Sequence, residues 1–423
     1  MDKKELLIQS FHAAVAAADP ARIVARHLPN PPRGRTLVVG AGKAAASMAR
    51  ALEQAWPGTA PLEGVVVTRY AHGAATERIR VVEAGHPLPD ASGETAAAEI
   101  LARTAELGRD DRLIVLVSGG GSSLLSLPVK DVPMTDLRAV TQALLKSGAP
   151  ITEINIVRKH LSQIQGGRLA AACRAPITTL IVSDVTGDEP SAIASGPTCA
   201  DPSTYADALA ILERYGVNAP ASVQGWLQAG AAGRIEETPK PGDPVFAQVD
   251  NLVIATASQS LQAAADFFRQ QGIAPAILGD TVTGEASEVA KVYAALVREI
   301  RARNQPFVAP VALISGGECT VTVRGNGRGG RCAEFLVALA ALLDGMADVY
   351  ALAADTDGID GTEDNAGALL YPDSKERAMR LGLNVDAMLA NNDGYGYFLA
   401  LGDLLVTGPT LTNVNDYRVI LVA

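Results

Sequence analysis

The chain has few aromatic residues and no excess of positive charge. Phe, Trp and Tyr together make up 4% of the 423 residues, and the formal net charge is -10 at pH 7. A protein that binds nucleic acid normally presents a basic face, or aromatic side chains on which bases stack. The composition therefore argues against a nucleic-acid partner, and any anionic ligand has to be attracted by local cations.

Cysteines are also scarce. The chain has four, and they are far apart and form no C-x-x-C pair: Cys173, Cys199, Cys319 and Cys332. This spacing indicates neither a disulfide framework nor a zinc site. Isolated thiols fit a reducing compartment such as the cytoplasm.

Long apolar runs are missing as well. No stretch is long enough to cross a bilayer as a helix. The N-terminus, MDKKELLIQSFHAAVAAADP, has acids among its first charges and is typical of a short amphipathic helix rather than of a signal peptide. We therefore expect a soluble, cytoplasmic protein without a membrane partner.

Aliphatic residues dominate what is present: 48% of the residues are apolar and only 19% are charged, which at this length predicts two globular domains. Apolar segments typical of buried strands alternate with alanine-rich segments typical of helices, and this alternation predicts α/β architecture with a parallel sheet covered on both faces. In the first half, strands are expected at Leu37–Val39, Gly64–Thr68, Arg80–Glu83, Arg112–Ser118 and Thr179–Ser183.

A proline- and glycine-rich segment, Glu237–Val245, interrupts this rhythm and is the expected linker. It divides the chain into domains at residues 1–240 and 241–423. The second domain is expected to begin with further α/β units, the first with a strand at Leu252–Ala255, and to continue with shorter strands in a more mixed sheet.

Four junctions place a glycine-rich turn after an apolar run. They are Thr36–Met48, Leu113–Ser126, Val311–Thr320 and Val323–Phe335. Glycine lets the backbone approach a ligand closely, and a following helix presents unpaired N–H groups to a phosphate or carboxylate. Repeated turns of this kind, with cations beside them, predict an enzyme that handles a phosphorylated nucleotide and a small anion.

The first turn contains Gly40, Gly42 and Lys43 and satisfies the loose G-x-G-x-x-A form of the dinucleotide pattern. The acidic residue that should follow about twenty positions later is missing, because the next strand ends in Thr68 and Arg69. The Walker pattern is not met either. The turn is therefore interpreted as a phosphate site with charge from Lys43, or as a tight structural turn.

The second turn has three consecutive glycines and two hydroxyl residues at the start of an expected helix, Ser118-Gly119-Gly120-Gly121-Ser122-Ser123. Its N–H groups and hydroxyls could cradle phosphates. A G-x-S-x-G nucleophile elbow is absent, which disfavours serine hydrolysis.

Asp184 follows a strand-like run, and Asp188 stands close behind it. Carboxylates at the end of a strand suit Mg²⁺, which takes one or two protein oxygens and completes its shell with phosphates and water. Capping or turn formation is the alternative for each residue.

Glu318, Arg328 and Arg331 stand among the glycines of the last two junctions. The planar fork of arginine suits a carboxylate or phosphate. Arg331 also stands before the expected helix Cys332–Leu343, where its side chain and the helix N-terminus could bind one anion together. Two further acid- and amide-rich clusters, at residues 355–361 and 407–416, are interpreted as turns or as functional segments.

Taken together, these motifs resemble the glycerate 2-kinase family, whose C-terminal part is the MOFRL domain. The resemblance covers nearly the whole chain and rests on VVGAGKAAASMA, EAGHPLPD, LVSGGGSSLL, INIVRKHLSQIQGGRLA, SDVTGDEPSAIASGPT, ISGGECTVTVRGNGRGGR, TDGIDG and LLVTGPTLTNVND. It implies an ATP- and Mg²⁺-dependent kinase that converts D-glycerate to 2-phosphoglycerate, with a Rossmann-like N-terminal domain and an active site between the domains. Some relatives carry the label hydroxypyruvate reductase.

The resemblance makes Lys43 and an arginine of the GRGGR turn the catalytic candidates and the SGGGSS loop a nucleotide site. The chain departs from the family at Gln165, where lysine is usual, and at Cys332-Ala333, where Asn-Gln is usual. His86, within EAGHPLPD, is a candidate base, with stabilisation of a turn as its alternative role.

Two other functions stay open. A nicotinamide-dependent hydroxypyruvate reductase would use the Gly40 turn for pyrophosphate, but it would lack the acid that binds ribose. A non-catalytic sensor of nucleotide or organic acid would have no need of Lys43, Arg328 and Arg331. Assembly into a homodimer is also left open.

Overall fold

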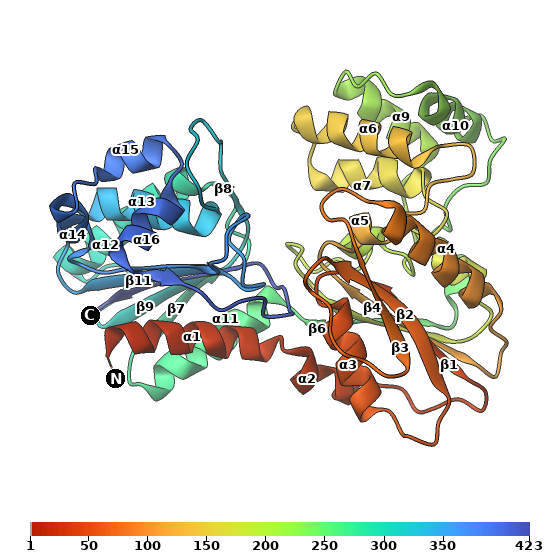
Figure 1. Ribbon diagram of the computed structural model, residues 1–423, viewed down its shortest axis with the longest axis horizontal. Helices are drawn as coiled ribbons and strands as arrows, with labels where there is room; N and C mark the ends of the chain where they lie inside the picture. Colours follow the sequence, from red (N-terminus) through yellow and green to blue (C-terminus); the bar gives the residue numbers. More distant parts are fainter. Residues whose placement is uncertain (1) are drawn as a thin grey trace. The chain divides into compact units, whose positions relative to one another are not determined.

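The computed structural model describes residues 2–423, which form two compact units (Figure 1). The first unit runs from Pro20 to Ile254, and the second combines residues 2–19 with Ala255–Ala423. The division thus lies beyond the expected linker, and the N-terminal helix belongs with the C-terminal part of the chain.

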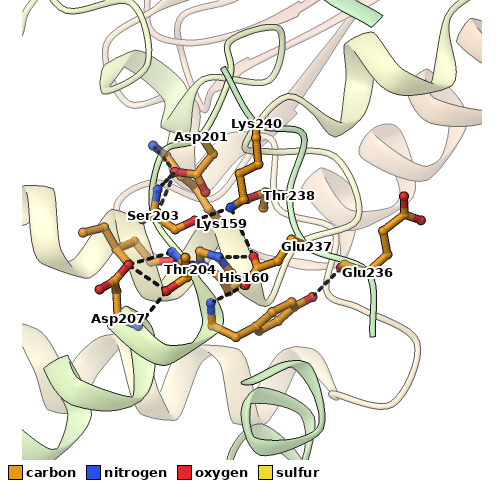
Figure 2. Close-up of polar contacts among 12 residues, drawn as sticks. Lys159, His160, Asp201, Ser203, Thr204, Asp207, Glu236, Glu237, Thr238 and Lys240 are labelled. Atoms are coloured by element: carbon orange, nitrogen blue, oxygen red, sulfur yellow. Dashed lines mark hydrogen bonds and ion pairs between the residues drawn. The ribbon is translucent and has the colours of Figure 1, made fainter. Parts of the chain in front are cut away.

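The expected linker is held inside the first unit by polar contacts (Figure 2). Glu237 accepts a hydrogen bond of 2.9 Å from the backbone N–H of Tyr205, and its other oxygen lies 3.2 Å from Nε2 of the buried His160. Lys240 donates to Oγ1 of the buried Thr238 at 2.8 Å. Proline and glycine therefore shape a bound loop here rather than a boundary.

The first unit is built on a six-stranded sheet in the order β3-β2-β1-β4-β5-β6. The strands are β1 (Thr36–Ala41), β2 (Leu62–Arg69), β3 (Ile79–Ala84), β4 (Arg112–Ser118), β5 (Ile177–Val182) and β6 (Val249–Ala255). Strands β3, β2, β1, β4 and β5 pair in parallel. The predicted parallel sheet is confirmed, and its order reverses between β1 and β4, the switch point at which such sheets bind ligands.

Helices lie against this sheet and in a separate group of four (Figure 1). Near the sheet are α2 (Pro20–Ile23), η1 (Val24–His27), α3 (Ala45–Ala55), α4 (Ala91–Ala105), α5 (Gly121–Leu124), α8 (Arg168–Ala172), η2 (Ile193–Ser195) and η3 (Pro244–Phe246). The group of four consists of α6 (Met134–Lys146), α7 (Ile151–His160), α9 (Tyr205–Arg214) and α10 (Ala221–Ala231). It has its own apolar core, to which α6 contributes Leu137, Val140 and Leu144 at helical spacing.

The second unit has a mixed sheet in the order β13-β12-β11-β14-β9-β7. Its strands are β7 (Ala274–Gly279), β9 (Val311–Ser315), β11 (Val349–Asp355), β12 (Gly367–Leu370), β13 (Leu404–Leu405) and β14 (Asp416–Val422). Only β7 and β9 pair in parallel among these neighbours. Two short strands, β8 (Gly284–Glu285) and β10 (Cys319–Thr320), form a separate parallel pair. The predicted mixed sheet is confirmed.

Helices cover both faces of this second sheet (Figure 1). One face carries α1 (Lys3–Ala17) and α11 (Ala257–Gln270), which pack against each other. The other carries α12 (Ala286–Arg303) and α13 (Arg331–Leu343), followed by α14 (Ser374–Arg380), α15 (Val385–Ala390) and α16 (Gly394–Leu401). Among residues 2–423, no helix combines the length and apolarity needed to cross a membrane.

Candidate active site

The turns after β1 and β4 are hydrogen-bonded to each other at the switch point. The backbone N–H of Lys43 donates to the carbonyl of Gly119 at 2.8 Å, and that of Ala44 donates to Oγ of Ser118 at 3.0 Å. Gly42 has a φ of +142°, and a Cβ there would stand 2.1 Å from the same Ser118 oxygen. The first two predicted turns therefore form one structure.

Two side chains converge over Gly120 in this structure. Gly120 has a φ of +78°, and a Cβ there would lie 2.8 Å from Nε2 of His86 and 3.5 Å from Cγ of Lys43. Glycine is thus required both by conformation and by space. Lys43 and His86, which are 43 positions apart by their residue numbers, are brought to the same turn.

The other glycines of these turns serve packing. Gly40 lies within β1, where a Cβ would stand 2.0 Å from the carbonyl oxygen of Leu116 on β4. A Cβ on Gly121 would stand 2.5 Å from that of Ala194, on the η2 segment. This places η2 against the loop, and Oγ of its buried Ser195 lies 2.9 Å from Oγ of Ser122. Ser195 was not singled out from the sequence.

The buried side chain of Gln165 supports the same loop. It is 2% exposed, and its Nε2 donates to the carbonyls of Ser122 at 2.8 Å and Leu125 at 3.1 Å. Oγ of Ser123 donates to the carbonyl of Gly120 at 3.1 Å. At the position where the resembled family usually has lysine, this chain therefore has an amide that fixes the loop backbone.

Asp184 and Asp188 lie on the loop after β5, the neighbour of β4 in the sheet. Across residues 2–423, no group of three or more His, Cys, Asp or Glu side chains is placed to hold a metal ion. The described residues therefore show no metal site of three or more such side chains. Mg²⁺ needs only one or two protein oxygens when phosphates and water complete its shell, so a magnesium site on this loop stays a prediction.

In the second unit, Arg331 is the centre of a partly buried ionic network. Its Nε donates to Asp416 and one Nη to Asp355, both at 2.8 Å, and its other Nη lies 3.4 Å from Glu318. The Arg331 side chain is 22% exposed, against 4% for Asp355 and 0% for Asp416. Burial lowers the pKa of Arg331, but these carboxylates raise it by more, so the side chain stays cationic.

The N-terminus of α13 is occupied by a carboxylate of the chain itself. The backbone N–H groups of Cys332 and Ala333 donate to Asp360 at 3.0 and 2.8 Å. Burial raises the pKa of Asp360 to about 6, although these two N–H groups oppose the shift. The expectation that Arg331 and this helix end bind one external anion together is therefore corrected, because Asp360 already takes the helix end.

Arg328 is placed differently from Arg331. Its side chain is 60% exposed, forms an ion pair with Glu363 and lies over the ring of Tyr395, 4.4 Å from the centroid. Glu318 is also exposed, at 56% of its side chain. The second unit thus brings Glu318 to Arg331, whereas Arg328 makes its contacts with other residues.

Sequence reasoning missed two buried charged residues of the second unit. Arg418 is 1% exposed and donates to Asp416 at 2.7 Å and to the carbonyl of Gly316 at 2.9 Å. Glu334 is 5% exposed on α13, and burial raises its pKa to about 7. The available signal was a charged residue inside an apolar strand or helix, which indicates a paired or perturbed group.

Comparison with known proteins identifies the family. Residues 6–228 match the family described as "Domain of unknown function (DUF4147)", and residues 311–416 match the MOFRL family. A proposed hydroxypyruvate reductase of Agrobacterium vitis is 51% identical, over 99% of this chain and 94% of its own length. The glycerate 2-kinase of Pyrococcus horikoshii is 39% identical, over 100% of this chain and 98% of its own length.

A solved structure agrees with these sequence relatives. The crystal structure of glycerate kinase from Thermotoga maritima has a TM-score of 0.89 and 37% identity, and the match covers 99% of both chains. The two family matches cover residues 6–228 and 311–416, and the relatives match over nearly the full length of the chain. The chain belongs to the glycerate 2-kinase family with a C-terminal MOFRL domain.

Proposed function

We propose that this protein transfers a phosphoryl group from ATP to D-glycerate and forms 2-phosphoglycerate. The observation that carries the proposal is the convergence of Lys43 and His86 over Gly120, at the switch point of a parallel sheet. Sheets of this order bind ligands at that point. Relatives that match over the full length and are named glycerate 2-kinase support the acceptor.

In the proposed reaction, the oxygen of the glycerate 2-hydroxyl attacks the γ-phosphorus of ATP. The bond from this phosphorus to the bridging oxygen of ADP breaks, and the hydroxyl proton is released. Positioning and charge neutralisation supply most of the catalysis in such transfers. The ammonium of Lys43 offsets charge on the transferred group, and the backbone from Gly42 and from Ser118 to Ser123 holds the nucleotide phosphates.

Carboxylates and arginines complete the proposed assignment. Asp184 and Asp188 would hold Mg²⁺, whose chemistry when bound is to neutralise charge on the phosphates. Arg331 is assigned to the glycerate carboxylate through the Nη that faces the exposed Glu318. Arg328, which is exposed, is assigned to the same acceptor.

An assay with ATP, Mg²⁺ and D-glycerate tests this function. We expect ADP to form only when glycerate is present, and ³¹P and ¹³C NMR of the product to place the phosphate on C2. The same preparation is given NADH and hydroxypyruvate, because two relatives from Agrobacterium vitis are proposed hydroxypyruvate reductases. Oxidation of NADH without any phosphorylated product would reverse the assignment, and nucleotide binding without either reaction would favour a sensor.

We also place the protein in the cytoplasm. The four cysteines are free thiols, which fits a reducing compartment.

A further inference from the structure

Within residues 2–423, Arg158 on α7 is a cation without an acidic partner, unlike Lys159 and Lys240 of the same unit. One residue on, Lys159 is 8% exposed and lies 3.6 Å from Asp201 (Figure 2). Lys240 lies 3.2 Å from Glu237 in the same view. Arg158, by contrast, makes no ion pair within residues 2–423, and its guanidinium donates only to the amide oxygen of Asn155, at 3.4 Å.

Leaving this side chain unpaired costs free energy. Burial alone lowers the pKa of Arg158 to about 10, and no carboxylate opposes the shift. Arg158 still carries its charge at neutral pH, so the folded protein keeps a partly buried cation that has no carboxylate beside it among the described residues. An apolar side chain of similar length would avoid this cost. A bound oxyanion would offset this cost.

Arg158 lines a small recess beside the glycine loop of the candidate active site. The recess is also lined by Pro89, three residues after His86, and by Ser122, Ser123 and Gln165. Its volume of about 10 Å³ admits one water-sized sphere. One oxygen atom of an anion can therefore enter, whereas a whole phosphate group cannot.

The neighbouring polar groups are already used within the protein. Ser122 pairs with Ser195, Ser123 donates to the carbonyl of Gly120, and the Gln165 amide spans two carbonyls of the loop. The guanidinium has five N–H donors, of which one has a long contact. Among the residues that line the recess, Arg158 is the one with a positive charge, and it is therefore the group suited to a charged oxygen.

We propose that Arg158 binds one anionic oxygen of a substrate, from a phosphate or a carboxylate, at the recess beside Ser122 and Ser123. The identity of the substrate rests on the proposed function, but the presence of an oxyanion site does not. Arg158 then adds a fourth cationic side chain to Lys43, Arg328 and Arg331, and it lies in the first unit beside the loop that Lys43 contacts.

The test compares two neighbouring substitutions on α7, Arg158→Met and Lys159→Met. Melting temperature and the affinities for inorganic phosphate, ATP and D-glycerate are measured for each full-length variant, the affinities by calorimetry. Arg158→Met should melt at or above the wild-type temperature and should weaken at least one affinity by roughly tenfold or more. Lys159→Met, which removes the ion pair of the buried Asp201, should melt several degrees lower. Arg158→Lys should keep part of the affinity, because it keeps the charge.

Comparing the affinities for the three ligands shows which substrate supplies the oxygen. A loss confined to phosphate and ATP assigns the recess to the nucleotide, and a loss confined to D-glycerate assigns it to the acceptor. A drop in melting temperature for Arg158→Met comparable to that of Lys159→Met, with all affinities unchanged, would overturn the inference, as would a wild-type protein that binds none of the three. Because binding is measured without turnover, an Arg158-dependent phosphate site in a protein without kinase activity would refute the proposed function and leave the inference standing.

Discussion

Replacing Arg331 with alanine should destabilise the second unit strongly. The substitution leaves Asp355 and Asp416, whose side chains are 4% and 0% exposed, without the cation that they share. Breaking a buried ion pair by removing one partner costs about 3–5 kcal/mol. Arg418 still contacts Asp416, so the main loss falls on Asp355, which loses its 2.8 Å ion pair with Arg331.

This cost can be measured as a melting temperature. In a unit of this size, 1 kcal/mol shifts the midpoint by roughly 2–4 °C, so Arg331→Ala should melt roughly 6–20 °C lower by circular dichroism. Both tryptophans, Trp56 and Trp226, lie in the first unit, so tryptophan fluorescence reports on the part of the chain that lacks the substitution. We expect the fluorescence midpoint to shift less than the dichroism midpoint.

Two further variants separate charge from packing. Arg331→Met combined with Asp355→Asn removes both charges and keeps an oxygen that can accept the bond from the Asp357 N–H. This double variant should regain part of the stability lost by Arg331→Met alone. Arg328→Ala should change the midpoint little, because Arg328 is exposed. An Arg331→Ala protein that melts within about 1 °C of wild type would refute the reasoning.

Three other substitutions test the candidate site and its surroundings. Lys43→Ala should lower kcat by on the order of 100-fold with little change in melting temperature, because it removes charge aimed at the transferred group; near-normal turnover would exclude Lys43 from the mechanism. Gly120→Ala should lower kcat/KM at least roughly tenfold, because its Cβ would displace His86 or Lys43 from the turn; steady-state kinetics at matched folded fraction decide this. Glu334→Gln should be as stable as wild type near pH 4.5 and more stable by about 1–3 kcal/mol near pH 8.5. The pKa of Glu334 is raised to about 7 in the folded protein, so the wild-type protein loses stability as the pH rises above the pKa of the unfolded state. Equal stabilities at both pH values would contradict the raised pKa.

The sequence alone predicted the elements whose signal is local. Strands β1, β4 and β5 are buried at nearly every position, so their apolar runs could be recognised without knowledge of their neighbours. The glycine and hydroxyl turns after β1 and β4 could be recognised for the same reason. Parallel strands end at one edge of a sheet, and the tertiary structure accordingly joins these two turns.

Elements defined by distant partners were not predictable in the same way. The strand expected at Leu252–Ala255 was placed in the second domain, but β6 belongs to the first sheet, and β12 was missed. Helix α1 packs against α11, which begins at Ala257. Which sheet an edge strand joins depends on surfaces that form only when the chain folds, and composition does not record that choice.

The same distinction applies to the site. Residue types and spacing singled out Lys43, the Ser118–Ser123 loop and Arg331, because glycine beside a cation or hydroxyl is a local chemical pattern. Only the tertiary structure decided that Asp416, 85 positions away, neutralises Arg331, and that Asp360 takes the helix end. It also decided that Arg158 faces a recess without an acid while its neighbour Lys159 is paired. A charged residue shows its chemistry in the sequence, but its partner and its solvation are set by which segments the fold brings against it.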